Sequence, residues 1–139
     1  METATYDTEA TAWACGALRN LSALPAWSER LVAAGGIPLI VDALMQTTDA
    51  RVAAWAASIL LNVATWSTEG CVEIMEENAA DELVKLATDD DEGMEEIVEA
   101  ASKTLRVLAK RDKAWRRQII DLGGGEVVDA TLFEVCCGC

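Results

Sequence analysis

The side chains best suited to binding chemistry are tryptophans and asparagines that recur at helical spacing. Trp13 and Asn20 are seven residues apart, as are Trp55 and Asn62, so each pair shares one face of a helix. An asparagine amide donates and accepts hydrogen bonds and holds a peptide backbone without reading its sequence, while a tryptophan ring takes apolar or cationic side chains. The pairs predict a surface that binds an extended peptide. The alternative is structural, with the rings packed between helices and the amides bonded to a neighbouring turn.

Other residues extend the same strip. Ser58 and Trp66 fall on it at helical spacing, and Lys103 and Arg111 align with them 45 residues later. Positive charge there favours an acidic or phosphorylated segment, with ordinary solvated surface as the alternative. The predicted partner-binding groove comprises Trp13, Asn20, Trp55, Ser58, Asn62, Trp66, Lys103 and Arg111. The remaining tryptophans, Trp27 and Trp115, are predicted to be structural.

The residue inventory argues against catalysis. The chain has no histidine, so neither a Ser-His nor a Cys-His nucleophile can form. A Ser-Lys pair is conceivable, but no motif indicates one, and the many carboxylates fall on predicted exposed helix surfaces. The glycines at 123–125 follow no predicted strand and fit a turn better than a phosphate loop. We expect a protein that is not an enzyme, with no cofactor and no small-molecule substrate.

The five cysteines do not form a disulfide framework. Cys15 and Cys71 are spaced like core residues, whereas Cys136, Cys137 and Cys139 crowd the C-terminus. This usage predicts a reducing compartment. We interpret the tail as a frayed end or a truncated product, with lipidation, soft-metal binding and redox chemistry as alternatives.

Charge is unevenly distributed along the chain, whose net charge is −13. The segment 69–99 holds thirteen acids and one base, and the segment 103–117 holds seven bases and one acid. The two patches are either solvated helix faces or a means of steering partners. The acids at 89–92 are expected to favour the positive N-terminal end of the following helix, with divalent metal binding as the alternative; we predict no metal site.

The same composition narrows the partner and the location. Strong acidity makes a nucleic-acid partner unfavourable. No apolar stretch approaches the roughly 18 residues that span a membrane, and the first residues do not resemble a signal peptide. We expect a cytoplasmic location, with the nucleus as a second compartment, and no membrane association unless the cysteine tail is lipidated.

Two blocks of sequence recur with a period near 43 residues. The first block lies at 14–22, 56–64 and 101–109, and the second at 26–41, 74–84 and 114–128. Each period predicts three helices: a short one stopped by the Gly35-Gly36 turn, a second one starting at Ile37-Pro38, and a long one capped by Thr48 or Asp49. Asn78 replaces the glycine pair in the middle repeat.

These blocks resemble the armadillo-repeat family. Residues 14–22, ACGALRNLS, are similar to its third-helix signature, and residues 33–41, AAGGIPLIV, to its junction between first and second helices. The resemblance implies a groove, lined by the third helices, that holds extended peptides. Asn20 and Asn62 match the groove asparagine, whereas Val107 departs from it. Gly16 and Ser58 stand where importin-α-type grooves carry tryptophan, so the chain is more similar to scaffold and catenin-like members.

The predicted architecture is therefore all-α, a right-handed armadillo-type superhelix of about three repeats. It comprises a partial repeat at 8–24, repeats at 25–66 and 67–111, a partial repeat at 112–135 and a cysteine-rich tail at 136–139. The predicted function is a non-catalytic scaffold that binds a protein or peptide, with a nucleic-acid-binding helical repeat as the alternative. Open solenoid ends also predict self-association.

Overall fold

A computed structural model describes residues 8–128, and every regular element in that part of the chain is a helix. The helices are α1 (Thr8–Ser22), α2 (Pro25–Ala33), α3 (Gly36–Gln46), α4 (Ala50–Trp66), α5 (Thr68–Glu76), α6 (Ala79–Ala87), α7 (Glu95–Arg111) and α8 (Lys113–Ile119). The predicted all-α class is confirmed.

Helix boundaries follow local backbone chemistry. Gly35 and Asn78 both adopt left-handed φ angles, of 79° and 61°, and separate the short first helix from the second helix of each repeat. Both are residue types that tolerate this conformation. Asp49 caps α4 by accepting a hydrogen bond from the Arg51 N–H at 2.8 Å, and the Arg51 side chain beside it lowers the pKa of the carboxyl. Ser67 caps α5 in the same way. The predicted turn at Gly35 and the predicted Asp49 cap are confirmed, whereas α3 begins at Gly36, one residue before the predicted start at Ile37-Pro38.

The start of α7 differs from the expectation for the acids at 89–92. Met94 occupies the N-cap position and its side chain makes no capping hydrogen bond. The acids within the first turn of α7 are Glu95 and Glu96. Because the dipole effect falls off within one turn, these two carboxylates complement the helix end, and the earlier run lies in the connection that precedes it.

The C-terminal part of the described chain turns at glycine. After α8, residues Ile120–Gly124 form a widened turn in which Gly123 has a φ of 105°, a backbone conformation that glycine adopts without strain. Residues 125–128 are helical again. The predicted turn of the repeat thus falls at Gly123 and Gly124, whereas Gly125 begins the next helical segment.

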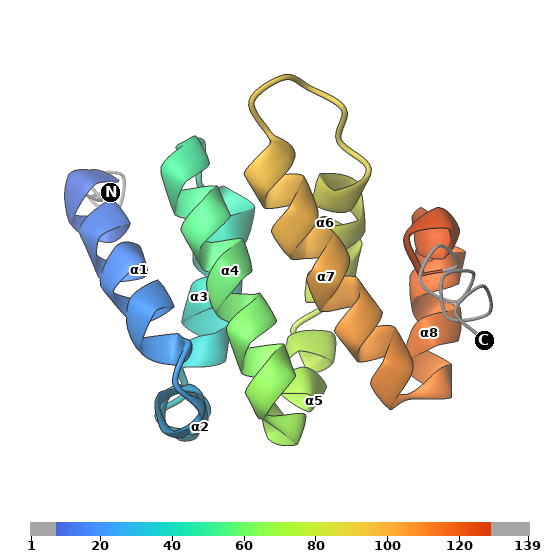
Figure 1. Ribbon diagram of the computed structural model, residues 1–139, viewed down its shortest axis with the longest axis horizontal. Coiled ribbons are helices and arrows are strands. Elements are labelled where there is room, and N and C mark those ends of the chain that lie inside the picture. The colour runs from blue at the N-terminus through green and yellow to red at the C-terminus, as the bar shows by residue number, and fades with distance from the viewer. Residues whose placement is uncertain (1–7, 129–139) are drawn as a thin grey trace.

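The helices form two layers (Figure 1). Helices α1, α4 and α7, which we call the third helices, lie side by side in a row, with α3 and α6 behind them. The largest fully buried side chains come from both layers and include Ile37, Ile59, Leu60, Ile74, Leu83, Leu105 and Leu108. Central α4 packs against α1 and α7, so each repeat buries its apolar face on the next.

None of the described helices is long and apolar enough to cross a membrane. The predicted partial repeat at 112–135 is described only as far as Val128. The cysteine tail, Cys136, Cys137 and Cys139, lies outside the described residues.

Candidate functional site

An open hollow of about 390 Å³ lies between the third helices α4 and α7. Its lining residues are Leu61, Asn62 and Thr65 from α4 and Lys103, Arg106, Val107 and Lys110 from α7. We call this set the basic hollow, because every charged residue in it is a base. Two predicted groove residues, Asn62 and Lys103, are therefore brought together.

The bases of the hollow are mostly accessible. Lys103 and Lys110 are exposed, and the Lys103 ammonium forms a surface ion pair with Glu99 at 3.1 Å. Half-buried Arg106 donates from Nε to the Val127 carbonyl at 3.3 Å. Sequence reasoning missed Arg106 and Lys110, although their spacing from Lys103 places all three on one helix face.

Asn62 lies at the edge of the hollow but faces the preceding helix. Its Nδ2 donates to the carbonyl oxygen of Arg19 at 3.3 Å and to Ser22 Oγ at 3.0 Å. The last carbonyls of a helix have no partner within it, so Asn62 satisfies the C-terminal end of α1. Within residues 8–128 its Oδ1 receives no hydrogen bond. The Nδ2 half of the amide thus makes a structural contact with α1.

Arg111 makes a similar contact one repeat later. Its Nη1 donates to Thr68 Oγ1 and its Nη2 to the Thr65 carbonyl, both at 3.1 Å. The guanidinium therefore closes the C-terminal end of α4 and does not line the basic hollow. Trp66, at that same helix end, is 45% exposed.

The tryptophans and small residues predicted for the groove separate into two groups. Trp55 is half-buried, and a Cβ built at Gly16 would lie 3.4 to 3.6 Å from three of its ring atoms. The ring therefore packs on α1 at a position without a side chain, and Ser58 beside it is half-buried. In contrast Trp13 is 74% exposed and Asn20 is exposed.

The two tryptophans predicted to be structural differ. Trp115 is partly buried against the core. Trp27 is 41% exposed, with the Arg30 guanidinium 5.1 Å from its ring centroid. Only Trp115 fits the expectation of a packed side chain.

The described thiols are buried. Cys15 and Cys71 are free and buried, and Cys71 Sγ donates to the Ala64 carbonyl at 3.3 Å. Burial raises the pKa of both thiols, although nearby Arg111 partly opposes this at Cys71. Because the thiolate is the reactive form, these positions behave as core residues, as their spacing predicted.

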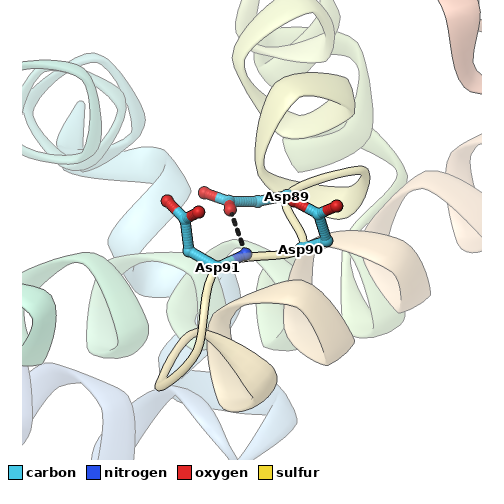
Figure 2. Close-up of side chains that lie close together, drawn as sticks. All are labelled: Asp89, Asp90 and Asp91. Carbon is cyan, nitrogen blue, oxygen red and sulfur yellow. Dashed lines mark hydrogen bonds between the residues drawn. The ribbon is translucent and has the colours of Figure 1, made fainter.

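The acidic connection between α6 and α7 brings three carboxylates together (Figure 2). Oxygen atoms of Asp89, Asp90 and Asp91 lie within 4.8 Å of one another, and the Asp91 N–H donates to Asp89 Oδ1 at 2.9 Å. Such a side-chain turn is an ordinary way to order a loop. Exposed carboxylates of this kind are common without an ion.

Comparison with known proteins gives similarity of structure only. No family model and no curated protein matches the chain. Two crystal structures of engineered proteins from the Northeast Structural Genomics Consortium are each 30% identical to it, with TM-scores of 0.78 and 0.79 over 92% and 91% of this chain. A third, 24% identical, has a TM-score of 0.75 over 88% of this chain. The chain spans 51%, 30% and 49% of those proteins.

Proposed function

We propose that this chain is an armadillo-type interaction module that binds an extended, acidic peptide segment of a partner protein across the third helices. The observation that carries the proposal is the basic hollow. A chain of net charge −13 gathers Lys103, Arg106 and Lys110 around one open depression. Concentrating the scarce bases at a concave site favours an anionic ligand.

The armadillo-type assignment is supported by three features. The period near 43 residues yields three helices in each repeat. The third helices lie side by side in one row (Figure 1). The left-handed turn at Gly35 falls within the segment that resembles the family's junction between first and second helices. Together these features favour a superhelix whose third helices form the ligand face.

The chemistry of the hollow suits a peptide backbone with acidic side chains. Asn62 Oδ1 can accept a hydrogen bond from a peptide N–H, since only its Nδ2 is engaged with α1. Leu61 and Val107 supply apolar lining, and the bases can pair with carboxylates. Packed helices are about 8–10 Å apart and an extended chain advances about 3.3 Å per residue, so each third helix would meet roughly every third residue.

The proposed role is non-catalytic, with no cofactor and no small-molecule substrate, and the cysteine usage supports a reducing compartment, the cytoplasm or the nucleus. The partner is a protein segment. A nucleic acid is also anionic, so it must be tested beside the peptide.

The test is a binding titration with three fluorescent peptides of equal length: one rich in Asp and Glu, one neutral and one rich in Lys. We expect the acidic peptide to bind and its affinity to fall as salt is raised. The double substitution Lys103→Glu and Lys110→Glu should weaken acidic-peptide binding at least tenfold.

The matched control is Lys113→Glu, which makes half the charge change at an exposed position of α8 outside the hollow. It should weaken binding only slightly. Equal binding of all three peptides would refute the proposal. So would an equal loss of acidic-peptide affinity, per unit of charge changed, in the control variant and the hollow variant. Tighter binding of a single-stranded RNA than of the acidic peptide would favour the nucleic-acid alternative.

A further inference from the structure

The side of α1 that points away from α4 carries exposed side chains whose equivalents in α4 contact a neighbouring helix. Trp13 and Asn20 occupy in α1 the positions that Trp55 and Asn62 occupy in α4. In α4 both residues contact the preceding helix, through the Trp55 ring on Gly16 and the Asn62 amide on the Arg19 carbonyl. In α1 the equivalent tryptophan is 74% exposed and the asparagine is exposed.

The internal repeat shows what kind of surface covers such a pair. Helix α1 lies beside α4 in the row. It places Gly16, which has no side chain, against the Trp55 ring, and it offers the Arg19 main-chain carbonyl to Asn62. Among the described residues α1 stands at one end of this row, and no further third helix follows α7 at the other (Figure 1). Helix α8 contacts α7 at that end as α2 contacts α1, so the far side of α1 and the α7 edge beside α8 are two halves of one type of interface.

We propose that the exposed side of α1 binds the α7 edge of a second copy of this chain, so that copies associate head to tail. The repeat offsets of 42 and 45 residues place Lys103 at the position of Gly16 and Arg106 at the position of Arg19. The Trp13 ring then lies over the exposed Lys103 side chain, where a cation is attracted to the ring face. Asn20 lies opposite Arg106, but α7 continues to Arg111, so the Arg106 carbonyl is already bonded within the helix and the Trp13 contact is the main one of this interface.

The same register contains one unfavourable pair. Within the chain Glu9 pairs with Arg51 at 3.0 Å across α1 and α4. Where α7 of one copy meets α1 of the other, Glu96 would lie opposite Glu9, because Glu9, Arg51 and Glu96 occupy equivalent positions in the three repeats. Like charges limit the affinity, so a charge change at this position can strengthen the association.

The experiment measures average mass by light scattering from low to high micromolar protein, without any peptide. Because the interface joins two different surfaces, growth is open-ended, and we expect masses above that of a dimer at high concentration. Trp13→Ala should weaken association roughly tenfold or more. Glu96→Lys should strengthen it roughly threefold at low salt. Both positions are exposed, so folding should be retained.

The matched control is Trp66→Ala. Trp66 is also an exposed tryptophan, but α4 has a third helix on each side, so the substitution should leave self-association unchanged. Mixing Trp13→Ala protein with Lys103→Glu protein should give species of two chains and no larger, because each variant keeps one working surface. A wild-type chain that stays monomeric at high micromolar concentration would overturn the proposal. So would a Trp13→Ala variant that associates as strongly as the wild-type protein, or a mixture of the two variants that stays monomeric.

Discussion

Asn62 reaches from its own helix to the C-terminal end of the preceding third helix. Its Nδ2 bonds the Arg19 carbonyl and Ser22 Oγ, and Ser22 Oγ in turn donates to the Arg19 carbonyl at 3.0 Å. Ser28 Oγ donates to the Ser22 carbonyl at 2.7 Å. One amide thus joins α4 to the point where the chain passes from α1 to α2.

We therefore expect Asn62→Ala to lower stability by about 1–2 kcal/mol, because each lost hydrogen bond is worth about 1 kcal/mol. The measurement is thermal unfolding by circular dichroism at low protein concentration. The matched control is Asn20→Ala, which changes the equivalent exposed residue of α1 and should stay within about 0.5 kcal/mol of wild type. Equal melting of the two variants would show that the Asn62 contacts are not stabilising.

Glycine sets how closely α5 approaches its neighbours. A Cβ built at Gly70 would overlap Val63 Cγ1 and would lie 3.2 Å from Val32 Cγ2. Val63 is fully buried and branched at Cβ, so it has little freedom to move away. The Gly70 N–H donates to Ser67 Oγ at the start of α5, which holds the backbone at this position in place.

Gly70→Ala should therefore destabilise the protein by about 1–3 kcal/mol, the usual cost of overpacking a core. Gly16→Ala makes the same chemical change in α1, where the nearest ring atom of Trp55 is at an ordinary contact distance of 3.4 Å. That variant should be neutral or stabilised, because alanine favours a helix over glycine by about 0.5–1 kcal/mol. Chemical denaturation of both variants checks the difference; a Gly70→Ala protein as stable as Gly16→Ala would contradict this packing.

Charge acts on the molecule as a whole. Most acids fall in one segment, 69–99, which spans α5, α6, the acidic connection and the first turns of α7. The one base within that segment, Lys85, forms an exposed ion pair with Asp81 at 3.9 Å. Repulsion among exposed like charges destabilises a compact state, and added salt screens it over a Debye length of about 10 Å at 0.1 M.

The melting temperature should therefore rise as sodium chloride is increased from low to moderate concentration. Replacing Asp89, Asp90 and Asp91 with Asn removes three of the crowded charges and should flatten this rise. A melting temperature that falls with salt in the wild-type protein would show that ion pairs outweigh the repulsion. A rise of the same size in the substituted protein would show that the connection between α6 and α7 does not contribute to it.

The sequence by itself determined the helical class, the period and most helix ends. These depend on local chemistry: Gly35 and Asn78 adopt left-handed angles because their side chains tolerate them, and the Asp49 cap needs only the next two residues. The apolar stripe that the period repeats is also a property of each segment alone. The burial of Cys15 and Cys71 followed from the same spacing.

Only the tertiary structure decided which face residues meet a neighbouring helix and which meet a hollow. Asn62 and Arg111 were both predicted to line the groove, and each bonds the end of the preceding third helix, but only Asn62 also lines the basic hollow. Arg106 and Lys110 were not predicted as groove residues, yet they line the basic hollow. Spacing along one helix gives an angle around its axis, but the neighbour that lies at that angle depends on the packing and register of two helices.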